Sequence, residues 1–117
     1  MAVDLSALNT IDGFVGAALV DGNSGMSMGQ EGGGPIDLDV ASAGNTEVVQ
    51  AKRRVAKSLK LKDNIEDMLI TLGKQYHLIR PLSEKEDLFL YLVLDRNKSN
   101  LGMARHELKE FEASVEM

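Results

Sequence analysis

The sequence predicts an α+β protein in which one antiparallel sheet is packed between helices. Two observations lead to this expectation: five short apolar segments are bounded by turn-forming residues, and a long segment over residues 37–59 has apolar residues at helical spacing. Helices on both sides of one sheet bury these segments economically. With 117 residues, 44% of them hydrophobic, we expect a single domain over residues 1–117.

A short helix and a β-hairpin are expected first. Residues 4–11 can form about two helical turns with Asp4 as the N-cap. Residues 14–20 (FVGAALV) form an apolar run typical of a strand covered on both faces, although a buried helix has the same pattern. The turn residues at 21–25 then lead into a shorter strand at 26–30.

A long helix is expected over residues 37–59, with Asp37 as its N-cap, after the flexible sequence EGGGP. The main apolar arc of this helix is about 100° wide, which is the width that a helix lying on one sheet needs. We therefore expect this arc to face the sheet. It contains Val40, Gly44, Val48, Ala51, Val55 and Leu59.

Two features of this helix exceed what one sheet requires. Ala41, Val49 and Ala56 extend the arc on one flank, so we expect the flank to meet a second surface such as another helix. Gly44 costs about 1 kcal/mol in an exposed helix interior. Either the close approach of another backbone or a kink would explain Gly44.

Three strands and a helix are expected in the C-terminal half. Residues 65–72, 76–82 and 88–94 are joined by short connectors, which predicts an antiparallel meander. The run at 88–94 (LFLYLVL) has no polar residue, so we place it centrally in the sheet. An amphipathic helix follows, begun by either Ser99 or Asn100.

Composition and motifs argue against several classes of function. The chain has no cysteine, and its two histidines, His77 and His106, have no metal-ligand spacing. The phosphate-binding GxxxxGK[ST], the dinucleotide-binding GxGxxG and the nucleophile motif GxSxG are all absent. We therefore expect no enzymatic activity, no cofactor and no metal.

The charge and hydropathy of the chain limit its partners and location. A net charge of −5 disfavours nucleic acid, which requires a basic surface. No apolar run is long enough to cross a membrane, and the first eight residues do not resemble a signal peptide. We therefore expect a cytoplasmic protein.

Two segments, together with the order of the elements, resemble the roadblock family, named for the dynein light chain roadblock. The segments are IDGFVGAALVDGNSGM near the start and FLYLVLDRNKSNLGMARHEL near the end. The family carries GVxGAxLVDxxG in its first strand and Asn-Leu-Gly-x-Ala-Arg at the start of its last helix. Residues 13–25 and 100–105 match these motifs, and the chain is similar to a stand-alone bacterial member.

The resemblance implies a profilin-like α/β/α sandwich with sheet order 2-1-5-4-3, the long helix on one face and the terminal helices on the other. It also implies homodimers in which the long helices pack antiparallel and the third strands pair edge to edge. The apolar edge strand at 65–72 favours the same pairing. The expected dimer-interface residues are Ala41, Gly44, Asn45, Val49, Ala56, Ile65, Met68, Ile70 and Leu72.

The resemblance also implies a function. Roadblock proteins have no known enzymatic activity of their own and act as dimeric platforms in dynein and Ragulator assemblies. In bacteria they act beside small Ras-like GTPases. We therefore expect a homodimeric regulator or scaffold for such a GTPase or for a larger assembly. The alternative is a monomeric profilin-like sensor that holds a small ligand between its sheet and helix.

Basic residues are concentrated near the end of the long helix. Six of the 13 Lys and Arg residues lie within residues 52–62. They form either a surface for an acidic patch on a GTPase or for anionic lipid headgroups, or simply a solvated helix C-terminus. Arg53, Lys57 and Lys60 project away from the apolar arc and are the expected partner-binding residues.

Overall fold

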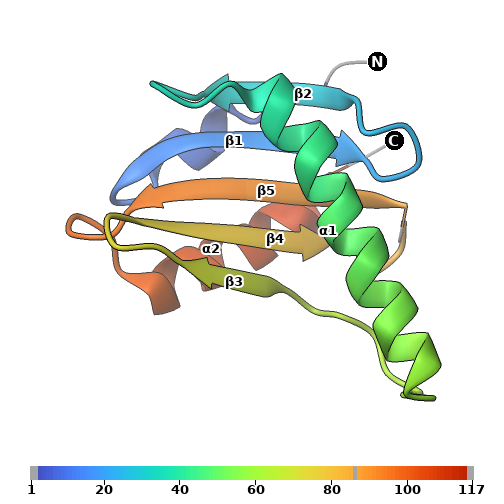
Figure 1. Ribbon diagram of the computed structural model, residues 1–117. Helices are drawn as coiled ribbons and strands as arrows, with labels where there is room; N and C mark the ends of the chain where they lie inside the picture. Colours follow the sequence, from blue (N-terminus) through green and yellow to red (C-terminus); the bar gives the residue numbers. More distant parts are fainter. Residues whose placement is uncertain (1–2, 86, 116–117) are drawn as a thin grey trace.

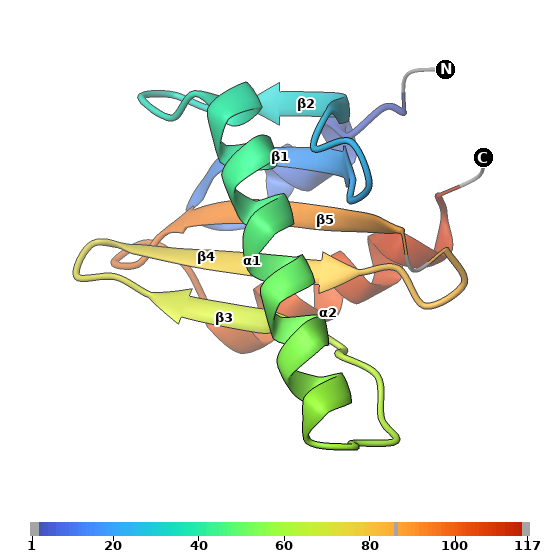
Figure 2. The same cartoon turned by 45° about the vertical axis from the view of Figure 1, so that its right-hand side comes forward.

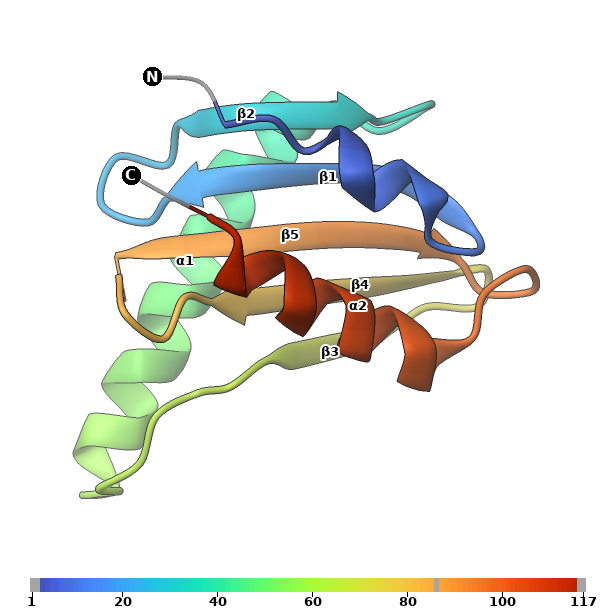
Figure 3. The same cartoon turned by 180° about the vertical axis from the view of Figure 1, so that it is seen from behind.

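The computed structural model describes residues 3–85 and 87–115. Five strands form one antiparallel sheet with the order β2-β1-β5-β4-β3. The long helix α1 crosses one face of this sheet, and the short helix η1 and helix α2 cover the other (Figures 1, 2 and 3). The expected α+β fold and strand order are confirmed.

The N-terminal helix is shorter and tighter than expected. η1 (Ser6–Thr10) is a 3-10 helix, and the backbone N–H of Ser6 donates to the Asp4 carboxylate at 2.8 Å. Leu5, Leu8 and Ile11 are all buried. Their spacing of three residues places them on one side of a helix with three residues per turn, so the expected α-helix is wrong in type although its apolar side is as expected.

The first two strands form the expected hairpin. β1 (Phe14–Asp21) pairs with β2 (Ser27–Gly32) on one side and with β5 on the other. Its pairing excludes the buried-helix alternative for residues 14–20. β2 ends at Gly32, so the first two residues of EGGGP belong to the strand.

The other three strands form the expected meander. β3 (Met68–Thr71) pairs with β4 (Gln75–Pro81), and β4 pairs with β5 (Leu88–Asp95). β3 is shorter than expected because residues 65–67 and Leu72 lie outside the pairing.

Both long helices begin at side-chain caps. α1 (Leu38–Ser58) begins after Asp37, whose carboxylate accepts the N–H groups of Asp39 and Val40 at 3.0 and 3.2 Å. α2 (Leu101–Ala113) begins after Asn100, whose side chain accepts the Met103 N–H at 3.0 Å. The start of the last helix is therefore Asn100 rather than Ser99.

The core has two layers, one on each face of the sheet. Successive side chains of β5 alternate between these layers, and all of them from Leu88 to Leu94 are buried. This confirms the central position of β5. The layer beneath α1 contains Ala18, Val20, Leu38, Val49, Ile79, Phe89, Tyr91 and Val93. The layer beneath η1 and α2 includes Leu5, Leu8, Leu19, Leu78, Leu90, Leu92, Ala104 and Leu108.

Candidate protein-binding interface

The outer face of α1 is apolar and exposed. Val40, Val48, Val55 and Leu59 have 68%, 42%, 46% and 63% of their surface exposed. A Cβ placed on Gly44, on the same face, would meet no atom within 4 Å apart from its own helix. No other backbone of the described chain therefore approaches Gly44. This face carries a stripe of aliphatic side chains that the fold does not cover.

The main arc of α1 thus faces away from the sheet, and the expected orientation of this helix is wrong. The sheet-facing residues are Leu38, Ser42, Thr46 and Val49. Ser42 and Thr46 are buried because their hydroxyls donate to the carbonyls of residues 38 and 42, at 2.6 and 2.8 Å. Hydroxyls satisfied in this way can be buried at little cost, which a hydrophobic pattern does not register.

Three residues expected at a dimer interface instead face the sheet. Val49 is 1% exposed and Ala41 packs against the core layer beneath α1. Asn45 is half-buried and hydrogen-bonds Tyr91 of β5. Ala41 and Val49 of the flank therefore face this chain's own sheet. Ala56, the third residue of the flank, is half-buried and lines a hollow beneath the end of the helix. Gly44 is the residue of the expected helix set that lies on the outer face.

Asn45 belongs to a polar chain beneath α1. The Tyr91 hydroxyl lies 3.1 Å from Nδ1 of His77, and Nε2 of His77 lies 2.9 Å from Oε1 of Gln75. Burial lowers the pKa of His77, and burial raises the pKa of Tyr91 against the opposing effect of its bond to Asn45. A neutral imidazole that donates from Nε2 and accepts at Nδ1 satisfies every bond in this chain.

The edge strand β3 divides its side chains between the core and solvent. Met68 and Ile70 pack against the layer beneath α1, whereas Leu69 is 41% exposed and Leu72, the residue after the strand, is 43% exposed. Ile65 precedes the strand and is half-buried. Of the expected edge residues, Leu72 is exposed, whereas Ile65, Met68 and Ile70 are half-buried, and Leu69, outside the expected set, is exposed as well.

The two edges of the sheet differ. The N–H of Val3 donates to the carbonyl of Met28 at 3.3 Å, so the N-terminal segment contacts β2 at this position. A Cβ on Gly29 would lie 2.5 Å from the Val3 carbonyl oxygen, which shows how closely this segment approaches. Within residues 3–85 and 87–115, β3 pairs with β4 alone. β3, which no such segment contacts among the described residues, is thus an edge available for pairing.

The basic residues at the end of α1 occupy different positions. Arg53 is half-buried and Lys57 is exposed, and both line a hollow beneath the helix. Lys60 is exposed and has a φ of +58°. The N–H groups of Lys60 and Leu61 donate to the carbonyls of Lys57 and Ala56, both at 3.0 Å, which forms a Schellman turn with Lys60 at the left-handed position.

Replacing Lys60 by glycine is expected to raise the free energy of unfolding by about 1 kcal/mol, because glycine adopts positive φ without steric cost. Urea denaturation followed by circular dichroism measures the change. Lys57→Gly, which lies within the last helical turn, serves as the control and should lower this free energy by up to about 1 kcal/mol. A loss of stability in Lys60→Gly would contradict the assigned turn.

The hollow lies between the end of α1, the connector to β3 and the end of β4. Its volume is about 940 Å³, and its lining includes Arg53, Lys57, Ile65, Asp67 and Arg80. Cationic, anionic and apolar side chains are mixed in this lining. The hollow is a candidate contact for a protein partner or a small ligand.

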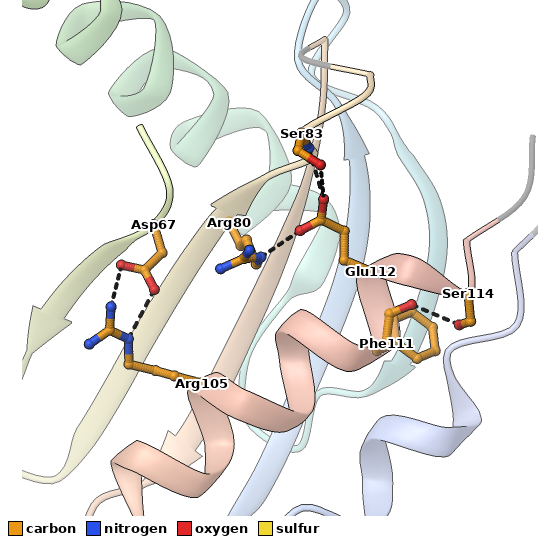
Figure 4. A network of polar contacts seen from close by, with 7 residues as sticks. All are labelled: Asp67, Arg80, Ser83, Arg105, Phe111, Glu112 and Ser114. Atoms are coloured by element: carbon orange, nitrogen blue, oxygen red, sulfur yellow. Dashed lines mark hydrogen bonds and ion pairs between the residues drawn. The ribbon is translucent and has the colours of Figure 1, made fainter. Parts of the chain in front are cut away.

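Two ion pairs fix the side of the hollow nearest α2 (Figure 4). Nε of Arg80 lies 2.6 Å from Oε1 of Glu112, whose Oε2 accepts the N–H and hydroxyl of Ser83 at 2.8 and 2.9 Å. Arg105 of α2 forms two hydrogen bonds with Asp67 at 2.9 and 3.1 Å. Both pairs join α2 to chain segments that line the hollow.

The ionisation of Glu112 depends on these partners. Burial alone would raise the pKa of Glu112, but the Ser83 N–H, Arg80 and the Ser83 hydroxyl together hold it below its usual value. Both side chains of the Arg80–Glu112 pair are largely shielded, with 13% and 11% of their surface exposed. This pair leaves no signal in the sequence, because 32 positions separate its members and neither lies in a motif.

The described residues offer neither a metal site nor a helix that could span a membrane. Among residues 3–85 and 87–115, no three His, Cys, Asp or Glu side chains are grouped so that they could hold a metal ion. None of the described helices is long and apolar enough to cross a membrane. The exposed helix face, the free strand edge and the hollow are therefore the features that the candidate interface offers.

The chain is similar to known proteins in its structure rather than in its sequence. No protein-family model matches the sequence, and no curated protein matches it. A Roadblock/LC7 domain from Streptomyces avermitilis superposes with a TM-score of 0.85 at 14% identity, covering 98% of this chain and 95% of that one. The gliding protein MglB from Thermus thermophilus gives 0.78 at 19% identity, covering 92% and 79%.

A structure described as MglB with tetrameric arrangement gives a TM-score of 0.81 at 18% identity, covering 94% of this chain and 80% of that one. These identities are too low to transfer a function, but the agreement extends over almost the whole chain in each case. The order of strands and helices described above matches the fold of these structures. The chain therefore has the roadblock/LC7 fold.

Proposed function

We propose that the chain forms a homodimer through the outer face of α1 and the free edge of β3, and that the dimer is a non-enzymatic regulator or scaffold for a small Ras-like GTPase. The uncovered stripe on α1 is the observation that carries the dimer. Contiguous exposed apolar surface on a small protein marks an interaction site. The roadblock/LC7 fold supports the same arrangement.

Gly44 supports helix-to-helix packing. It lies between Val40 and Val48 on the exposed face, where glycine weakens the helix and nothing in the chain requires it. The lack of a side chain allows a second helix to approach closely. Two copies of α1 related by a two-fold axis would bring both glycines and both valine rows together.

The edge of β3 supplies the second part of the interface. Unpaired N–H and C=O groups on this edge can continue the ladder with a second copy of β3. Leu69 and Leu72 would become shielded by this pairing, whereas Met68 and Ile70 already contribute to the core beneath α1. Edge pairing and helix packing could therefore act together in one dimer.

The mass of the protein in solution tests the dimer directly. Size-exclusion chromatography with light scattering should give about twice 12.7 kDa. A stable species of 12.7 kDa at micromolar concentration would remove this proposal. If the protein is a dimer, analytical ultracentrifugation over a concentration series gives the dissociation constant of that dimer.

The GTPase is proposed as the partner because the bacterial roadblock proteins that the sequence resembles act beside small Ras-like GTPases. Similarity to a gliding protein, MglB, supports a regulatory role. Arg53 and Lys57, at the hollow, are the proposed contacts because they offer positive charge to an acidic surface.

A tagged form of the chain should capture a small Ras-like GTPase from a lysate of the source cells, as identified by mass spectrometry. The variant Arg53→Glu/Lys57→Glu should capture at least about tenfold less, because like charges would face each other. Lys98→Glu/Lys109→Glu, which changes the same charge at exposed sites elsewhere, serves as the control. Equal capture by both variants, or no GTPase with the unmodified protein, would contradict the proposal.

The hollow supports a second candidate function, a sensor that binds a small ligand between helix and sheet. Its volume of about 940 Å³ is in the range of ligand pockets. A ligand at 100 times its dissociation constant would add about 2.7 kcal/mol to the free energy of unfolding. A thermal-shift screen that finds such a ligand, together with a monomeric mass, would favour the sensor over the dimeric regulator.

A further inference from the structure

We propose that two arginines, Arg105 and Arg96, hold the two ends of β3 in place and thereby keep its free edge ordered for pairing with a second copy of the chain. This inference deepens the dimer proposed above and rests on it. It adds two positioning residues that belong neither to α1 nor to β3, the two elements of the proposed contact.

The ladder with β4 gives β3 little support of its own. β3 has four residues and, within residues 3–85 and 87–115, pairs with β4 alone. Residues 65–67, which lead into the strand, lie outside this pairing. A short strand bonded along one side loses conformational entropy at every residue in return for few hydrogen bonds. Contacts at its two ends therefore contribute to how well the edge is ordered.

Arg105 holds the start of the strand. This arginine lies on α2, and its Nε and a terminal nitrogen donate to the two carboxylate oxygens of Asp67 at 2.9 and 3.1 Å (Figure 4). Asp67 is the residue immediately before β3, and its side chain is only 14% exposed. An arginine that binds a carboxylate through two bonds fixes its direction as well as its distance. The backbone that enters β3 is thus tied to α2.

Arg96 holds the end of the strand. This arginine follows β5, and a terminal nitrogen of its side chain donates to the carbonyl of Leu72, the residue after β3, at 3.1 Å. Its backbone N–H donates to the carbonyl of Lys74 at 3.0 Å. Its guanidinium carbon lies 5.6 Å from the centre of the Tyr76 ring, within the range of a cation–π contact. These contacts tie the turn between β3 and β4 to the end of β5.

An ordered edge favours association. A flexible strand has to lose its conformational freedom when it pairs with a second copy, whereas a strand that is already held has lost this freedom during folding. The N–H and C=O groups that a second β3 would bond lie between the two held positions, Asp67 and Leu72. The two arginines would therefore raise the affinity of the dimer through β3.

Analytical ultracentrifugation of the variant Arg105→Gln/Arg96→Gln tests the inference. Its dimer dissociation constant should be at least about tenfold above that of the unmodified protein, because two contacts of charged groups are lost. Arg105→Lys/Arg96→Lys keeps the charges but not the forked donors, so it should give an intermediate value. Lys98→Gln/Lys109→Gln removes the same charge at exposed sites on the same segments and should stay within about twofold of the unmodified protein.

Amide hydrogen exchange, measured by NMR, shows whether the arginines act through β3. The background is Val48→Glu/Val55→Glu, chosen so that a second copy does not protect the strand. Arg105→Gln should accelerate exchange at the start of β3, and Arg96→Gln should accelerate exchange of the Leu72 N–H, which donates to a β4 carbonyl at 2.9 Å. Each increase should be at least about fivefold, whereas the amides of β1 and β5 should change less than about twofold.

The outcomes separate this inference from the dimer on which it rests. If the unmodified protein is monomeric at every concentration, the dimer falls and the inference falls with it. If the protein dimerises and Arg105→Gln/Arg96→Gln has an unchanged dissociation constant, the dimer stands and the role of the arginines is overturned. Exchange that is unchanged in β3, or that rises equally in all strands, would also overturn this role, because the arginines would then not order the edge specifically.

Discussion

The variant Val48→Glu/Val55→Glu is expected to have a mass of 12.7 kDa by light scattering, whereas the unmodified protein is expected to give about twice that value. Both valines are exposed, so the substitutions leave the fold of one chain unchanged. A two-fold axis between helices would bring four carboxylates into one contact. Burying charges without partners costs several kcal/mol, which should raise the dissociation constant by orders of magnitude.

The control for this experiment is Met103→Glu/Ala113→Glu, which also replaces two exposed apolar residues by glutamate. Both residues lie on α2, on the other side of the sheet from α1. This variant should remain dimeric. If Val48→Glu/Val55→Glu remained dimeric as well, with unchanged circular dichroism, the outer face of α1 would not be the interface.

The variant Glu112→Gln is expected to lower the free energy of unfolding by about 2 kcal/mol at neutral pH. The substitution removes the charge that holds Arg80 and Ser83, and hydrogen bonds to charged groups contribute about 1.5–3 kcal/mol. Urea denaturation measures the difference. Glu110→Gln, also on α2 but with 71% of its side chain exposed, should change the stability by less than about 0.5 kcal/mol.

The effect of Glu112→Gln should depend on pH. Folding lowers the pKa of Glu112, so its stabilising effect is fully present above the pKa of the unfolded chain and is lost as the pH falls through the folded value. The unmodified protein and Glu112→Gln should therefore converge in stability in acid. A constant difference down to strongly acidic pH would show that the carboxylate is not what stabilises the contact.

The order of elements could be predicted because each leaves a local signal. The run at 88–94 is apolar on both faces, and β5 is covered on both sides. Asp37 and Asn100 stand immediately before helical patterns and cap α1 and α2. These signals depend on neighbouring residues, so one sequence is enough to recognise them.

The orientation of α1 could not be predicted from its apolar pattern. Its exposed face is more apolar than the face on the sheet, where Ser42 and Thr46 are buried by bonds within the helix. A protein that associates with a second surface can carry its larger apolar stripe outward. The apolar pattern reflects both the contact with the sheet and the contact with a second surface. It does not indicate which of the two contacts lies within the chain.

Only part of the candidate site could be predicted from the sequence, for a related reason. Arg53 and Lys57 could be selected from the charge run, and both line the hollow. The Arg80–Glu112 and Arg105–Asp67 pairs join residues that are distant in sequence, so their proximity depends on the completed fold. The charge run thus indicates the basic end of α1, whereas the residues that surround this end are known only from the tertiary structure.

The contact of Val3 with β2 has a consequence for how far association can proceed. A sheet with two open borders can add neighbours without limit, as fibres do. Here the Val3 N–H already bonds the Met28 carbonyl of β2, so a strand that added to this edge strand would have to compete with that contact. The N-terminal segment would therefore disfavour growth beyond the pairing of two β3 strands.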